Sequence, residues 1–353
     1  MFFINILANY IIPIIYDSLV SLVLVLSVLF VFRFKDPNIR IMFFFLPLIR
    51  PFIIIAEKVD FNLLYFNYNK TSLGFRVPDP KNIINIPFQD NYARLLAANM
   101  DYLIMTIIAA ALFVFLLARW INLALFYRNL AYEEKVTKND VPDIFKIISD
   151  FCLRTKIAAP DVSLTHKVYI SPFVVGVRKA TLVLSPRLIE NINNDEKEVL
   201  IRHELCHLKR KDNLTGWIAI ILKDLSFFNP FAYIAYYLIR AEQEKICDQL
   251  IIKYSNYTPL EVAQNILNSI KKLKLTIGPS SRLLPAFTSS FFVSRFISRK
   301  RLENRINVLV NTDVNKIYSR VLPKILMYLM FIFLLVFQIV YTFKIGNVVF
   351  ALR

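Results

Sequence analysis

The sequence is short of glycine, histidine and cysteine. Only five of its 353 residues are glycine, and it has three histidines and three cysteines. So little glycine excludes a collagen-like chain, and an apolar fraction of 56% excludes a disordered one. The cysteines, Cys152, Cys206 and Cys247, lie in the middle of the chain and suggest no disulfide framework. A reducing compartment therefore suits that part of the protein.

Apolar residues and positive charge are in excess. The chain has 31 phenylalanines and a mean hydropathy of +0.50, and its formal net charge is +17. A basic chain can bind nucleic acid, but in an apolar chain basic residues usually mark the cytoplasmic flanks of membrane spans. We therefore expect a multi-pass cell-membrane protein, with the lipid bilayer as a partner and no nucleic acid.

Four apolar runs predict four transmembrane helices. The second run is interrupted by Pro47, Arg50 and Pro51, so we expect it to be kinked or short, with Arg50 facing protein or the interface. The expected segments are a transmembrane hairpin at 1–56 (spans about 11–32 and 41–56), an extracytoplasmic loop at 57–100, a third transmembrane helix at 101–127, a cytoplasmic domain at 128–320, and a fourth transmembrane helix with a short tail at 321–353.

Basic residues near the ends of these runs predict the orientation. Seven lie on one side (Arg33, Lys35, Arg40, Arg119, Arg128, Arg320 and Lys324) and three on the other (Lys58, Arg94 and Lys344). The richer side is expected to be cytoplasmic. Both termini are then extracytoplasmic, and the central domain, which contains every histidine and cysteine, lies in the cytoplasm.

Two of the three histidines lie four residues apart in His203-Glu204-Leu205-Cys206-His207. Asn194 and the acidic residues after it predict the start of a helix through this motif. Residues four apart on a helix are neighbours, so the two imidazoles can bind one zinc ion, and Glu204 can act on a water molecule as general base. The alternative is a chance motif on an exposed amphipathic helix.

A catalytic zinc site needs a third protein ligand and an open position. A helix beginning at Pro230 would place Glu244 and Asp248 on one face, so that one carboxylate binds the metal and the other supports the site from behind. Glu242 points away and is the weaker candidate. The alternative for Glu244 is a solvated surface residue.

Four local patterns complete the sequence evidence: Ser171–Gly176, His203–His207 followed by Arg210 and Asp212, Asn229–Phe231, and Glu244–Asp248. With them, the chain resembles the BlaR/MecR-type integral-membrane zinc metallopeptidases, the proteases of β-lactam sensor-transducers and their sensorless relatives. The resemblance implies an α-helical membrane protein with an inserted α+β zincin-like (gluzincin) cytoplasmic domain. It also implies one zinc ion held by His203, His207 and Glu244, with Glu204 as the catalytic base and Asp248 behind the ligands.

The function implied by the resemblance is a zinc-dependent endopeptidase that cuts a cytoplasmic protein, with a transcriptional repressor as one candidate, in signal transduction. Only Gly346–Arg353 follow the last apolar run, so we expect no penicillin-binding sensor domain. Self-association is left open. Two rival functions remain: a peptidase of the HtpX or CAAX-prenyl-protease type in quality control or processing, and a non-catalytic membrane receptor with a relic site.

Three further segments are expected near the substrate or the membrane. Ser171, Pro172 and Phe173 belong to a strand expected to accept a substrate backbone, while the nearby His166 is more simply an ordinary strand residue. Self-cleavage is expected between Ser290 and Phe291, unless Phe291 belongs to the buried stripe of a helix. The basic run Arg295–Arg305 is expected to face anionic lipid.

Overall fold

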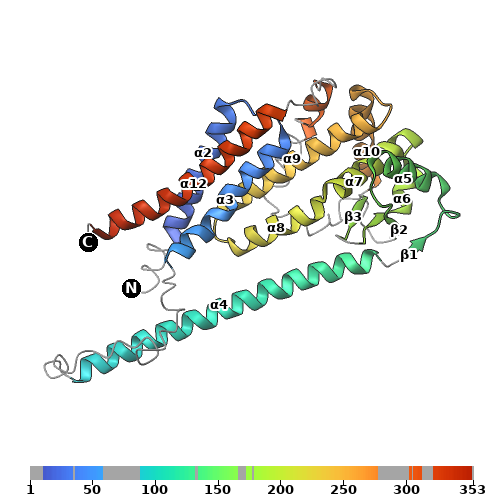
Figure 1. The fold of residues 1–353 in the computed structure, drawn as a ribbon. Helices are drawn as coiled ribbons and strands as arrows, with labels where there is room; N and C mark the ends of the chain where they lie inside the picture. Colours follow the sequence, from blue (N-terminus) through green and yellow to red (C-terminus); the bar gives the residue numbers. More distant parts are fainter. Residues whose placement is uncertain are drawn as a thin grey trace.

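The computed structural model describes residues 11–34, 36–58, 88–131, 134–165, 172–176, 179–276, 302–303, 305–311 and 321–351. These residues are mostly helical, with one small sheet (Figure 1). The elements are α2 (Ile12–Val31), α3 (Pro37–Lys58), α4 (Phe88–Ala131), β1 (Glu134–Val136), α5 (Pro142–Thr155), β2 (Asp161–Leu164), β3 (Phe173–Val175), β4 (Thr181–Leu184), α6 (Pro186–Asn191), α7 (Asn194–Arg210), α8 (Asp212–Leu225), α9 (Pro230–Tyr254), α10 (Pro259–Thr276) and α12 (Val321–Ala351).

Two helices of the described residues are long and apolar enough to cross a membrane, at Ile12–Val31 and Ile107–Asn129. A shorter apolar stretch, Ile325–Val340, lies within α12. Helix α3 runs through both of its prolines from Pro37 to Lys58. Helix α4 begins at Phe88, so its helical backbone covers the last part of the predicted 57–100 loop.

Helices α2, α3 and α12 lie side by side at one end of the molecule, while α4 runs along its length as a separate long helix (Figure 1). Arg50 of α3 is only 2% exposed and lies within this group. Its guanidinium forms an ion pair of 3.2 Å with Asp17 of α2 and donates to the backbone oxygen of Gln338 in α12. Arg50 therefore faces protein, as expected.

The sheet has the strand order β1-β2-β4-β3, so β3 forms one edge. Strands β2 and β4 are parallel, and β3 pairs antiparallel with β4, from Phe173 opposite Val183 to Val175 opposite Thr181. The turn after β3 needs glycine at position 176. Its φ is +95°, and a Cβ atom there would lie 2.1 Å from the Lys179 oxygen. The predicted pair of strands is confirmed.

The protein has two main hydrophobic cores, and α9 contributes to both. One core joins the sheet to α5, α7, α10 and the C-terminal half of α9, where Cys247 and Ile251 are fully buried. The other joins α2 and α3 to α8 and the N-terminal half of α9, where Ala235 and Ile239 are fully buried. The residues of α9 between these pairs therefore lie at the junction of the cores.

Helix α7 begins with two reciprocal hydrogen bonds. The Asn193 side chain accepts from the backbone N–H of Glu196 at 2.7 Å, and the Glu196 side chain accepts from the backbone N–H of Asn193 at 3.1 Å. This capping box satisfies donors that the first turn leaves unpaired. The helix thus starts where the sequence predicts, although its cap is Asn193 rather than Asn194. It ends at Lys211, whose φ of 58° turns the chain into α8.

Candidate active site

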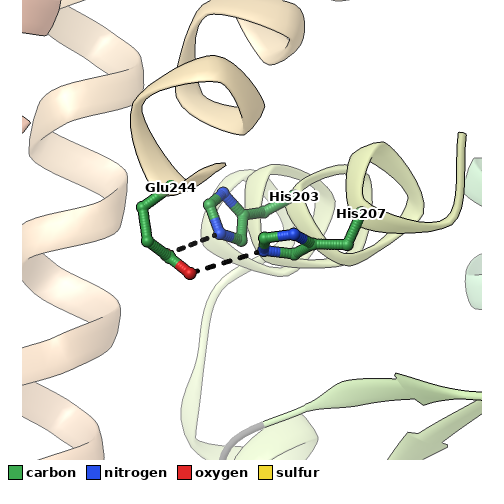
Figure 2. Close-up of side chains that lie close together, drawn as sticks. All are labelled: His203, His207 and Glu244. Atoms are coloured by element: carbon green, nitrogen blue, oxygen red, sulfur yellow. Dashed lines mark hydrogen bonds and ion pairs between the residues drawn. The ribbon is translucent and has the colours of Figure 1, made fainter. Parts of the chain in front are cut away.

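Two helices bring the motif histidines and a carboxylate together (Figure 2). The Nε2 atom of His203 in α7 lies 3.3 Å from Oε2 of Glu244 in α9, and Nε2 of His207 lies 3.6 Å from Oε1 of the same residue. Their potential ligand atoms all lie within 4.8 Å of one another. The structure therefore places these three predicted residues around one point.

The other nitrogen of each imidazole faces a second carboxylate. Nδ1 of His203 lies 3.2 Å from Asp248, one turn after Glu244 on α9, and Nδ1 of His207 lies 2.9 Å from Asp212, the first residue of α8. A carboxylate that accepts from Nδ1 holds the proton there and leaves the Nε2 lone pair available, and the contact of Asp212 with His207 has this form. Both Nε2 atoms are the ones that face Glu244, so this arrangement suits metal binding.

Arg305 joins the two carboxylates of α9. Its Nε and Nη2 atoms donate to the two oxygens of Asp248 at 2.9 and 2.8 Å, and its Nη1 atom lies 3.1 Å from Glu244. The side chain of Arg305 is 14% exposed. The expectation that this residue belongs to a lipid-facing basic run is therefore wrong, because the carboxylates of Asp248 and Glu244 provide a better environment for its charge.

These charges determine the protonation of the site. Burial alone would raise the pKa of Glu244, but Arg305 and the two imidazoles hold it well below its ordinary value. The pKa of Asp248 is also lowered, by Arg305 and His203 against the effect of burial. Both carboxylates are therefore ionised at neutral pH, as ligands and supports of a cation must be.

Glu204 faces a cavity of about 260 Å³. Burial raises the pKa of its carboxyl, and the nearby Glu244 carboxylate acts in the same direction against the two imidazoles. A raised pKa makes a carboxylate a stronger base, which suits proton transfer. Its lining combines polar residues with apolar ones, which include four residues of α7 and α10: Val199, Leu200, Ile266 and Ile270.

Edge strand β3 also borders this cavity, through Phe173 and Val174, with Pro172 immediately before it. Two of the three residues expected to receive substrate, Pro172 and Phe173, therefore lie beside the motif histidines. Ser171, His166 and the expected cleavage position at Ser290 and Phe291 lie outside the described residues.

Among the residues that line the cavity and that sequence reasoning missed are Tyr127 at the end of α4, Arg240 on α9 and Arg305. Arg240 lies one turn before Glu244, a local signal that could have identified it. Tyr127 makes an edge contact with the Phe173 ring, with centroids 5.9 Å apart, and only tertiary structure reveals this. Arg305 is 57 residues from Asp248, so no local pattern indicates their contact.

Cys206 and Cys247 are fully buried, as expected of small apolar fillers. Cys247 lies 3.3 Å from Nδ1 of His207, and with Asp212 these atoms form a second cluster that could hold a metal. Burial raises the pKa of the Cys247 thiol well above its ordinary value. Because a thiol binds metal as the thiolate, Cys247 is a poorer ligand than the imidazoles and Glu244.

Comparison with known proteins adds independent information. Residues 18–298 match the protein family described as "BlaR1 peptidase M56". A stretch of 122 residues, 34% of the chain, is 30% identical to the "Methicillin resistance mecR1 protein" of Staphylococcus aureus. A stretch of 83 residues, 24% of the chain, is 34% identical to the "Regulatory protein BlaR1" of Bacillus licheniformis.

Similarity extends to proteases with another name. A stretch of 91 residues, 25% of the chain, is 30% identical to the "Protease HtpX homolog" of Streptococcus equi subsp. zooepidemicus. The matched stretches cover 21% of the mecR1 protein, 14% of BlaR1 and 31% of the HtpX homolog, so the chain spans less than a third of each of these relatives.

The contact of Arg305 with the buried Asp248 carboxylate and with Glu244 gives a prediction for stability. Arg305→Met should lower the free energy of unfolding by about 3 kcal/mol, because it leaves buried charge without its partner. The control is Arg154→Met, which removes an exposed ion pair with Asp150 and should cost less than about 0.5 kcal/mol. Denaturant titration of the metal-free protein in detergent measures both, and equal losses would refute the role given to Arg305.

Proposed function

The chain belongs to the BlaR1 peptidase M56 family, and from this membership we propose that it is a membrane-bound, zinc-dependent endopeptidase. We assign the metal ligands to His203, His207 and Glu244. The observation that supports this assignment is the convergence of both Nε2 atoms on the Glu244 carboxylate while both Nδ1 atoms face other carboxylates. Two imidazoles with one glutamate are a common ligand set of catalytic zinc.

Bound zinc supplies a Lewis acid that acidifies water and polarises a peptide carbonyl. The protein residues provide the rest. Asp212 accepts from Nδ1 of His207, Asp248 lies 3.2 Å from Nδ1 of His203, and these two carboxylates orient the imidazoles. Arg305 holds Glu244 and Asp248 in place. Glu204 accepts a proton from the attacking water and passes it to the leaving amine.

The substrate in this proposal lies along β3. An edge strand has unpaired backbone groups to which an extended peptide can add as a further strand. The apolar wall formed by Val199, Leu200, Ile266 and Ile270 suits an apolar side chain next to the cleaved bond. Such a site selects an extended segment of a protein, as expected of an endopeptidase.

We further propose a regulatory role, in which the peptidase cuts a cytoplasmic protein such as a transcriptional repressor. The similarity to proteins named for regulation and methicillin resistance supports this role. Similarity to an HtpX homolog supports a second candidate, a peptidase with many substrates in quality control. Proteomics of cells with wild-type or Glu204→Gln protein separates them: one or a few cut proteins favour regulation, and many favour quality control.

The metal assignment predicts different behaviour for two glutamates of α9. Glu244→Gln should greatly reduce zinc content, because it removes a charged ligand. Glu242→Gln should retain zinc, since Glu242 is instead paired with Arg40 and Lys245. Glu204→Gln should retain zinc and lose peptidase activity, because it removes the base alone. Metal analysis of the purified proteins tests these outcomes, and full zinc content in Glu244→Gln would refute the ligand set.

The proposed topology has four spans, extracytoplasmic termini and a cytoplasmic peptidase domain, on the basis of the flanking charges. In intact cells, an impermeant thiol reagent should label a cysteine introduced at Pro78 and spare one introduced at Lys197. Both positions should react after lysis. Labelling of position 197 alone in intact cells would reverse the orientation and exclude a cytoplasmic substrate.

Self-cleavage between Ser290 and Phe291 is a further part of the proposal. The apolar wall of the cavity suits the Phe291 side chain. Wild-type protein should release a fragment that begins at Phe291, while Glu204→Gln stays whole. Phe291→Asp should block the cut and Phe296→Asp should not. N-terminal sequencing of the fragments tests this, and a cut that persists in Glu204→Gln would belong to another protease.

A further inference from the structure

The side chain of Asn213 connects the start of α8 to edge strand β3. Its Nδ2 amide donates one hydrogen bond to the backbone oxygen of Val174 and a second to that of Gly176, both at 3.0 Å. Asn213 also lines the cavity, as does Val174. One side chain therefore uses both of its amide hydrogens on the strand beside the motif histidines.

Both of these backbone oxygens accept from the Asn213 amide, one within β3 and one just after the strand ends at Val175. Strand β4 lies on one side of β3, and Asn213 comes from a helix outside the sheet. The hydrogen bonds therefore hold β3 from outside the sheet and use one lone pair of each oxygen, so they leave the strand's other backbone groups for an added peptide.

The residue before Asn213 performs a related task. Asp212 contacts Nδ1 of His207 at 2.9 Å, and Arg210 holds the Asp212 carboxylate through its Nε atom at 3.0 Å. Lys211, with a φ of 58°, makes the turn that brings Asp212 and Asn213 to the head of α8. Two consecutive side chains thus fix a motif histidine and the edge strand against the same turn.

We propose that Asn213 is a positioning residue for substrate, which sets the distance and register between β3 and the motif helix α7. This role rests on the proposed function, because it assumes that a peptide adds to β3 and is cut at His203 and His207. Asn213 then acts through the strand and does not touch the reacting bond. Loss of its hydrogen bonds weakens the binding of long peptides and leaves the chemical step nearly unchanged.

The test uses Asn213→Asp in the full-length protein, in detergent and with zinc added. Aspartate keeps the shape of asparagine but replaces the donor with a carboxylate that repels both backbone oxygens. The control is Asn191→Asp, at an exposed asparagine at the end of α6 whose amide bonds to the Arg187 oxygen. Peptides of four and eight residues with a central apolar residue serve as substrates.

For the octapeptide, kcat/KM should fall about tenfold in Asn213→Asp, mostly through KM, since two neutral hydrogen bonds account for an effect of this size. The tetrapeptide, which is too short to pair along β3, should be cut nearly as well as by wild type. Zinc content should not change. A loss of kcat alone, a loss of zinc or a lower KM would overturn the proposal.

A second measurement does not depend on activity. Amide hydrogen exchange in β3 should be at least tenfold faster in Asn213→Asp than in wild type, and unchanged in Asn191→Asp. Unchanged exchange in Asn213→Asp would refute the positioning role even in an active enzyme. The two proposals can fail separately. If the wild-type protein cuts no peptide but exchange in β3 is faster in Asn213→Asp, the proposed function is refuted and the positioning of β3 by Asn213 is not.

Discussion

The arrangement of the site depends on burying negative charge next to two imidazoles. Three carboxylates contact these rings: Glu244, Asp248 and Asp212. Buried carboxylates need cations or hydrogen-bond donors, because an unpaired buried charge costs several kcal/mol. Arg305 pairs with the two carboxylates of α9, and Arg210 with the one on α8. The Glu244 carboxylate lies where both Nε2 atoms converge, and this is the point at which we propose that zinc binds.

Glu244 and Asp248 need the charge of Arg305 beside them, and this fixes where residues 305–310 must lie. Residues 305–310 are helical, and Leu309 is buried in the same core as α7 and the C-terminal half of α9. The packing of Leu309 and the three contacts of Arg305 therefore reinforce each other. As a result, a segment distant in sequence from the histidine motif becomes a wall of the cavity, and the electrostatic balance of Glu244 requires that segment to be folded in place.

Local and non-local interactions explain how much the sequence could predict. Helix α7, the pairing of His203 with His207 and the common face of Glu244 and Asp248 follow from helix periodicity, so a few neighbouring residues suffice to infer them. The strand pair around Gly176 is local as well. Arg305 is different, because its basic neighbours indicate a lipid-facing surface and only tertiary packing brings it to Asp248. Helix α4 also extends upstream of its apolar run, through polar residues whose helical state hydropathy cannot predict.

Helix α9 makes the position of Glu244 depend on both cores. At its start, Asn229 accepts from the backbone N–H of Phe231 and donates to the hydroxyl of Ser18 in α2 at 2.7 Å. Glu244 lies on the same helix fifteen residues after Asn229, at roughly 22 Å along its axis. Arg40 of α3 also contacts Glu242 of α9 at 2.9 Å, two residues before Glu244. A helix is stiff over this length, so the contacts at one end of α9 affect the position of the other. The Glu244 carboxylate meets both imidazoles only if α9 can contact α2 and α3 and also contact α7.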